Sequence, residues 1–189
     1  MEKRNWKHSV TLKQRMVLCL AAFFAAFALQ LALNGYQARA VQQVQDDQMG
    51  NFNAISRFQG GVESSISILE AYRWENGETE EMLEKLQAAC STSNAWLWRI
   101  RSNMDGLQNV SDEQWVLYGA VETTYGSYNT LLEELESYLS SGQEAKASQL
   151  YYNKVSVCGG YLSQYTMQLL KASILDAQTT YTEISELGE

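Results

Sequence analysis

The residues MVLCLAAFFAAFALQLAL, at positions 16–33, decide the fold of this 189-residue chain. Only Gln30 among them is polar. At about 1.5 Å of rise per residue, a helix of this length nearly spans the roughly 30 Å hydrocarbon core of a bilayer. We therefore predict that residues 16–33 form a transmembrane helix.

The charges on the two sides of this segment predict how it crosses the membrane. Residues 1–40 hold six Lys and Arg against one acid, whereas residues 41–189 hold eight Lys and Arg against 21 acids. Because positive flanks stay in the cytoplasm, the basic tail, 1–15, is predicted to be cytoplasmic and residues 34–189 extracytoplasmic. The net charge of −8 argues against nucleic acid as a partner.

Two other interpretations of the apolar segment stay open. Ala38-Arg39-Ala40 has the small-x-small form of a signal peptidase site, so the segment could be a signal peptide that is removed. It could also be a helix buried in a soluble protein. We favour an uncleaved anchor because the apolar run is longer than the 7–15 residues of a usual signal core and ends several residues before that site.

Apolar residues recur at alternating spacings of three and four through the rest of the chain, which contains no proline. The clearest run is in the second predicted helix: Leu83, Leu86, Cys90, Ser93, Leu97, Ile100 and Met104. The third predicted helix shows the same alternation at Tyr118, Val121, Tyr125, Tyr128, Leu132, Leu135 and Leu139. We predict helices at about 34–75, 78–103, 111–140 and 143–186, with boundary errors of about 2–4 residues.

Turn-forming residues separate these helices, among them Asn76-Gly77, Asp105-Gly106 and Gly142. Short turns between amphipathic helices favour antiparallel neighbours. The predicted fold class is all-α, with an N-terminal transmembrane helix followed by an antiparallel up-down-up-down four-helix bundle.

Small residues gather at one predicted level of this bundle when each helix is counted from its distal turn. They are Gly60, Gly61, Cys90, Ser93, Gly126, Cys158, Gly159 and Gly160. Since glycine inside a helix costs about 1 kcal/mol relative to alanine, their placement needs a reason. One explanation is a tight waist where helix backbones approach or bend, so that leucine at Gly126 or Gly160 would overpack the bundle.

Aromatic residues at the same level offer another explanation, a small cavity for an organic ligand. Its predicted walls are Phe58, Trp96, Tyr125, Tyr128, Tyr161 and Tyr165. The two cysteines at this level, Cys90 and Cys158, could form a disulfide outside the cell. We favour two buried free thiols, because helices two and four would lie diagonally, beyond the roughly 7 Å that a disulfide can bridge.

The sequence predicts no catalytic centre, cofactor or metal site. The only histidine, His8, lies in the basic tail, and the chain has neither a CxxC pair nor a glycine-rich phosphate loop. Without a histidine outside the membrane, no nucleophile–base pair can be assembled there. We therefore expect no enzymatic activity from these residues.

A basic tail, one membrane helix and an amphipathic helix that follows it directly resemble the N-terminal region of bacterial transmembrane receptors. The layout is most similar to the four-helix-bundle sensor of two-component histidine kinases, and less so to that of chemotaxis receptors. The resemblance covers the whole chain but is architectural. It implies a homodimer through the bundle, an extracytoplasmic ligand or partner, and a signal carried by displacement between the first and fourth bundle helices.

In that family a second transmembrane helix and a kinase core follow the bundle. The chain stops at Glu189 without either, so we expect it to be truncated before the second span, with the kinase activity outside these residues. Two alternatives remain: a complete single-pass protein whose bundle is a structural or partner-binding module of the cell envelope, and a secreted bundle released after Ala40.

Overall fold

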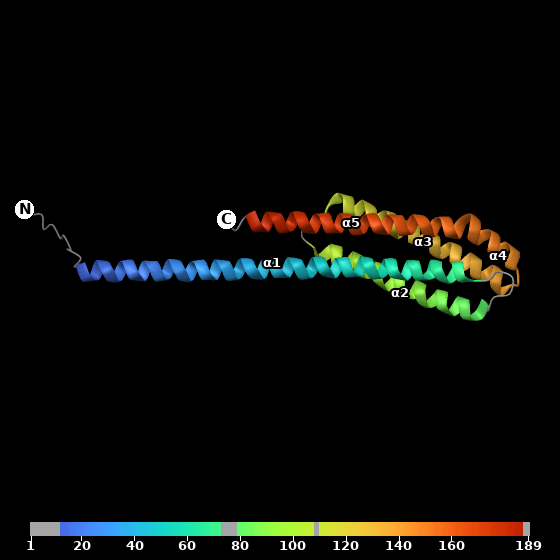
Figure 1. Cartoon of the computed structure of the whole chain (residues 1–189), viewed down its shortest axis with the longest axis horizontal. Coiled ribbons are helices and arrows are strands. Elements are labelled where there is room, and N and C mark those ends of the chain that lie inside the picture. Colours follow the sequence, from blue (N-terminus) through green and yellow to red (C-terminus); the bar gives the residue numbers. More distant parts are fainter. Residues whose placement is uncertain (1–11, 73–78, 108–109, 187–189) are drawn as a thin grey trace, which may run out of the picture. The chain divides into compact units, whose positions relative to one another are not determined.

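A computed structural model describes residues 12–72, 79–107 and 110–186. Within those ranges the chain is all-helical and contains no strand (Figure 1). The elements are α1 Leu12–Ala71, α2 Thr79–Gly106, α3 Asp112–Ser140, α4 Glu144–Leu150, the π-helical turn η1 Tyr151–Val155, and α5 Ser156–Glu186. α4, η1 and α5 follow one another without a break, so the described chain contains four helical segments.

The chain divides into two compact units, Met1–Gln43 and Val44–Glu189. In the first unit α1 exposes a run of large apolar side chains, which include Leu20, Phe23, Phe24, Phe27, Leu29, Leu31 and Leu33. The most apolar window of this helix is long and apolar enough to cross a membrane, and none of it is buried within the described chain. Exposing such side chains to water is unfavourable by roughly 25 cal/mol per Å². The helix is therefore a candidate membrane span by length and composition.

Local turn chemistry sets the ends of α3. The Ser111 side chain caps its N-terminus by accepting a hydrogen bond from the backbone N–H of Gln114 at 3.2 Å. At the other end Gly142 adopts a φ of +70°, which L-residues rarely take. The ends predicted for helices two and three agree with α2 and α3 within three residues. The predicted end of the first helix at residue 75 lies outside the described residues.

The fourth predicted helix, 143–186, contains the π-helical turn η1, which the sequence pattern did not predict. Four of the buried residues around it, Ala147, Tyr151, Val155 and Gly159, recur at three successive spacings of four, and Leu150 is buried beside Tyr151. Each step of four overshoots a full α-helical turn by about 40°, so three such steps would rotate the buried face away from the core. The wider turn accommodates this spacing and keeps one face buried.

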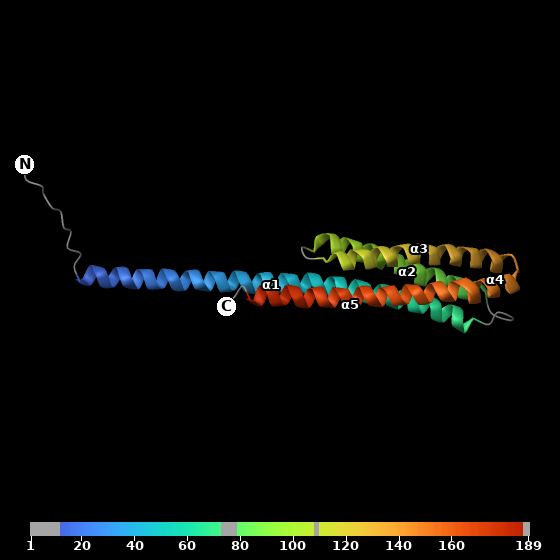
Figure 2. The ribbon, with the colours of Figure 1, turned by 90° about the horizontal axis from the view of Figure 1, so that it is seen from above.

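The core of the second unit consists of one buried face from each helix. Figure 2 shows α5 lying along the part of α1 that belongs to this unit. A buried hydrogen bond joins these two helices, since Asn51 Nδ2 donates to Ser173 Oγ at 3.2 Å. The largest fully buried apolar side chains are Ile55, Phe58, Val62, Leu69, Ile100, Met104, Val121, Tyr128, Leu135, Leu162 and Leu169. Every residue of the run predicted in α3 is buried in this core, whereas Leu83 and Cys90 of the run predicted in α2 are only partly buried.

Candidate functional site

Three of the six predicted cavity residues come together inside the second unit. Phe58 is 0% exposed, and its ring meets that of Tyr125 edge to face with centroids 5.2 Å apart. The Tyr125 hydroxyl donates to the Cys90 carbonyl at 2.8 Å, and the Tyr128 hydroxyl lies 3.0 Å from Ser65 Oγ. Each ring is thus packed and each hydroxyl has a partner, which is the arrangement of a core.

Of the other three predicted cavity residues, Trp96 and Tyr165 pack against the edge of this core and Tyr161 does not. Trp96 and Tyr165 are half-buried, and the Arg57 guanidinium lies 5.4 Å from the centroid of the Trp96 ring. Tyr161 is 55% exposed, so it lies on the surface of the unit instead of walling an interior space. The six aromatic side chains therefore do not enclose one common site.

The small residues separate into close contacts and open positions. A Cβ placed on Gly61 would meet Ser93 Oγ at 2.4 Å, and one on Gly159 would meet Ile66 Cδ1 at 3.2 Å and Tyr128 Cε2 at 3.3 Å. Gly60, Gly126 and Gly160 have nothing within 4 Å of such an atom. The expectation that leucine at Gly126 or Gly160 overpacks the bundle was wrong, because both positions face open space.

Cys90 and Cys158 are free thiols, as we favoured, although each is half-buried instead of fully buried. The Cys158 thiol lies 3.7 Å from the Thr124 carbonyl oxygen, which it approaches as a weak donor. Burial raises the pKa of Cys90 to about 11. A thiol that stays protonated at neutral pH is a poor nucleophile and a poor metal ligand.

Buried tyrosines are expected to make the second unit less stable as pH rises into the alkaline range. Burial raises the pKa of Tyr125 to about 12, and burial followed by the charge of Glu122 raises the pKa of Tyr118 to about 12. The pKa of Tyr128 is also raised, chiefly by burial. Because the folded state holds these protons more tightly than the unfolded state, their stabilising effect is complete below about pH 9 and is lost as pH rises through about 12.

We therefore expect the unfolding temperature to fall steeply between about pH 9 and pH 12. Circular dichroism would follow unfolding, and ultraviolet absorbance of phenolate would follow tyrosine ionisation. The two transitions should coincide for the buried tyrosines, because their ionisation favours the unfolded chain. Complete ionisation of all tyrosines before any loss of helix would contradict the prediction.

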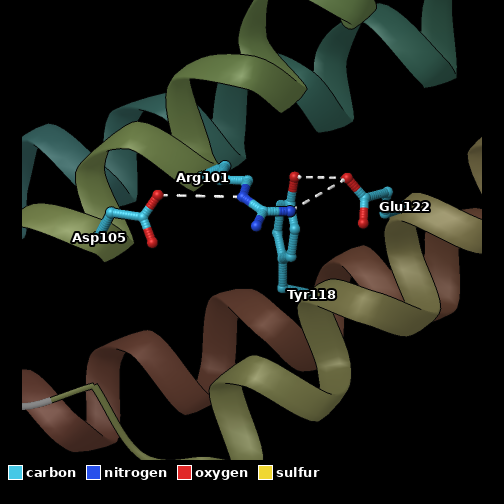
Figure 3. Close-up of polar contacts among 4 residues, drawn as sticks. All are labelled: Arg101, Asp105, Tyr118 and Glu122. Carbon is cyan, nitrogen blue, oxygen red and sulfur yellow. Dashed lines mark hydrogen bonds and ion pairs between the residues drawn. The ribbon is translucent and has the colours of Figure 1, made fainter.

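Figure 3 shows a polar cluster that joins α2 to α3. Arg101 Nε lies 3.9 Å from Asp105 Oδ2, and Arg101 Nη1 lies 3.8 Å from Glu122 Oε1. The Tyr118 hydroxyl donates to the same Glu122 oxygen at 3.2 Å. Because the charged groups are about half exposed, each ion pair contributes at most about 1 kcal/mol. The cluster fits a surface link between helices better than a reaction centre.

Asp176 on α5 forms a second polar link, at the start of α3. Its Oδ2 accepts hydrogen bonds from the Ser111 backbone N–H at 3.0 Å and from Gln114 Nε2 at 2.8 Å. Gln114 is almost completely buried, and its own Oε1 has no hydrogen-bond partner among the described residues. The carboxylate therefore satisfies donors that the protein interior would otherwise leave unpaired.

Replacing Asp176 with alanine is expected to lower the free energy of unfolding by about 1–3 kcal/mol, because the buried Gln114 amide loses its acceptor. Asp176→Asn is the matched variant: it keeps an acceptor oxygen and should lose less. Urea unfolding of both variants measures the difference. Equal stabilities for the two variants and the original chain would show that the bonds to Asp176 contribute nothing.

An apolar groove lies between α1 and α5 within the second unit. Its volume is about 770 Å³, and it is lined by Gln48, Met49, Phe52, Ser173, Ile174, Ala177, Gln178, Tyr181 and Thr182. None of these nine side chains is charged. Met49 and Tyr181 are more than half exposed. Gln48 is only 8% exposed, and its Oε1 has no hydrogen-bond partner among the described residues.

A smaller cleft, of about 420 Å³, lies between α2 and α3 and includes Cys90 and Tyr125. The sequence pattern predicted neither the groove nor the cleft. Gln48 and Ser173, polar residues on the buried faces of α1 and α5, were the one signal in the sequence that could have marked the groove.

No group of three or more His, Cys, Asp or Glu residues suited to a metal ion occurs in the ranges that the structure covers. Comparison with known proteins found no matching family model, no matching curated protein and no matching solved structure.

Proposed function

We propose that this chain is the signal-sensing module of a membrane receptor of the two-component histidine kinase type. Residues 16–33 anchor it in the cell membrane, and its second unit forms an antiparallel up-down-up-down four-helix bundle outside the cell. The long apolar helix and the helical second unit support the proposal. The groove between α1 and α5 is the observation that carries the proposal. A signal passed on by displacement between these two helices needs a binding partner that contacts both of them.

A second copy of the chain is the occupant that we propose for this groove. Residues 41–189 hold 21 acids against eight Lys and Arg, so two copies repel each other over most of their surface. The groove lining carries no charge and therefore lets two copies meet without that repulsion. Anchoring in one membrane also raises the effective concentration of the copies.

The buried bond between Asn51 and Ser173 lies beside this groove, since Ser173 also lines it. A partner that binds in the groove contacts both α1 and α5 and would therefore affect how these two helices pack against each other. Ligand-dependent changes at the interface would then alter how α1 packs against α5, and α1 contains the candidate membrane span.

Energy transfer between labelled copies tests self-association directly. Donor and acceptor fluorescent proteins fused to the N-terminus of the full chain are reconstituted into phosphatidylcholine vesicles at low density. We expect energy transfer that unlabelled chain competes away. Met49→Glu should abolish most of it, because it places a like charge from each copy in the interface. Val116→Glu on α3, where Val116 is 72% exposed and does not line the groove, is the matched control.

If Met49→Glu associates as strongly as the control, the groove is not the interface between copies. Membrane topology is tested separately by fusing alkaline phosphatase, which is active only outside the cytoplasm, after Glu189. We expect an active, membrane-bound fusion. An inactive fusion, or an active one released from the membrane, would contradict the anchored sensor.

A further inference from the structure

The cleft between α2 and α3 is the second hollow of the unit, and it lies between helices that the proposed dimer does not use. Its lining residues are Leu83, Leu86, Gln87, Cys90, Ser91, Asn94, Tyr125, Asn129, Leu132, Glu133 and Glu136. Leu86, Tyr125 and Leu132 are buried and form its base. A volume of about 420 Å³ falls within the usual range for small-molecule sites.

Two acceptor groups of the cleft lack a hydrogen-bond donor within the described chain. Asn129 Oδ1 is buried and has no partner among the residues that the structure describes. The Glu133 carboxylate likewise has no hydrogen bond or ion pair with the described residues, whereas Glu136 Oε1 accepts from Gln87 Nε2 at 3.0 Å. An acceptor that lacks a donor in the folded chain can gain one from a ligand.

The charge around the cleft determines which sign of charge a ligand must carry to bind there. The only charged lining residues are Glu133 and Glu136. α3, which supplies both, contains six acidic residues and no Lys or Arg. The resulting negative potential repels anions and concentrates cations. The leucines at the base favour a ligand whose cationic groups are joined by a short hydrocarbon chain.

We infer that the α2–α3 cleft binds a small organic cation, and specifically an aliphatic amine or diamine. One ammonium group contacts the Glu133 carboxylate, the hydrocarbon part covers Leu86 and Leu132, and a donor hydrogen reaches the Asn129 side chain. The inference depends on neither self-association nor membrane anchoring, so its failure would leave the proposed function standing.

Calorimetric titration of the full chain in phosphatidylcholine nanodiscs tests the inference. The probe is 1,4-diaminobutane, and the matched neutral probe is 1,4-butanediol, which has the same chain without the charge. We expect saturable binding of the diamine with a dissociation constant below about 1 mM and no saturable binding of the diol. Titration of empty nanodiscs measures binding to the lipid.

Three variants locate the binding. Glu133→Gln and Asn129→Leu should each weaken diamine binding at least about fivefold, a change of the size expected for one lost polar contact. Glu84→Gln, on α2 but outside the cleft lining, removes an equal charge and should leave the affinity unchanged. Thermal unfolding checks that each variant is folded, and Glu133→Gln is the safer test since Glu133 is exposed. Equal affinity for diamine and diol, equal loss in Glu84→Gln and Glu133→Gln, or no saturable binding of the diamine would each overturn the inference.

Discussion

Replacing Phe58 with alanine is expected to lower the free energy of unfolding of the second unit by about 3–5 kcal/mol. Phe58 is 0% exposed, and its ring packs edge to face against Tyr125 at 5.2 Å. Truncation removes the buried ring and leaves a cavity that close-packed neighbours fill only in part. Since domains are usually stable by only about 5–15 kcal/mol, the variant would lose a large share of its stability.

Urea unfolding of the full chain in nanodiscs, followed by circular dichroism, measures this loss. Tyr161→Ala is the matched control: Tyr161 was predicted to wall the same cavity as Phe58 but is 55% exposed. We expect it to change stability by no more than about 0.5 kcal/mol. A loss at Tyr161 as large as the loss at Phe58 would mean that both rings are interior.

Leucine at Gly61 or Gly159 is expected to destabilise the second unit by about 1–3 kcal/mol or more. A Cβ at Gly61 would lie 2.4 Å from Ser93 Oγ, and one at Gly159 would lie within 3.3 Å of both Ile66 and Tyr128. At Gly61 the Cβ and Cα of Ser93 also lie within 3.5 Å, so turning the Ser93 side chain frees little room. At Gly159 the two neighbouring side chains must shift by a few tenths of an ångström even before the rest of the leucine side chain is added. The loss would appear as a lower urea midpoint with the slope unchanged.

The adjacent glycines are the controls. Leucine at Gly60 or Gly160 meets nothing within 4 Å at its Cβ, and leucine has the better helix propensity by somewhat under 1 kcal/mol. These two variants should be as stable as the original chain or slightly more stable. If Gly60→Leu destabilises as much as Gly61→Leu, the contrast between facing and open positions is wrong.

The heptad runs predicted the buried faces of α2 and α3 well, because helical period alone determines which residues share a face. All seven residues of the run from Tyr118 to Leu139 are buried. The end of α3 was predicted from Gly142, whose backbone conformation is a local property, and its start is fixed as locally by the Ser111 cap. These features depend on neighbours within a few residues, and a sequence displays such neighbours directly.

The waist was predicted only in part, because counting residues places a glycine at a height along its helix but not on a side of it. Consecutive residues point about 100° apart, so Gly60 and Gly61 share a level while only Gly61 faces a neighbouring helix. The same limit placed Tyr161 among the interior aromatics. The two hollows depend on how side chains from separate helices fit together, which period and composition do not determine.

The π-helical turn bears on how the chain tolerates changes in its length. η1 spans Tyr151–Val155, and its three central residues, Tyr152, Asn153 and Lys154, are exposed. Removing one of these three residues would let the wide turn close into an ordinary α-helical one, while the buried positions on both sides keep their orientation. Related chains that differ by a single-residue deletion at this place would therefore be expected to share the same core, and an alignment should place its gap there.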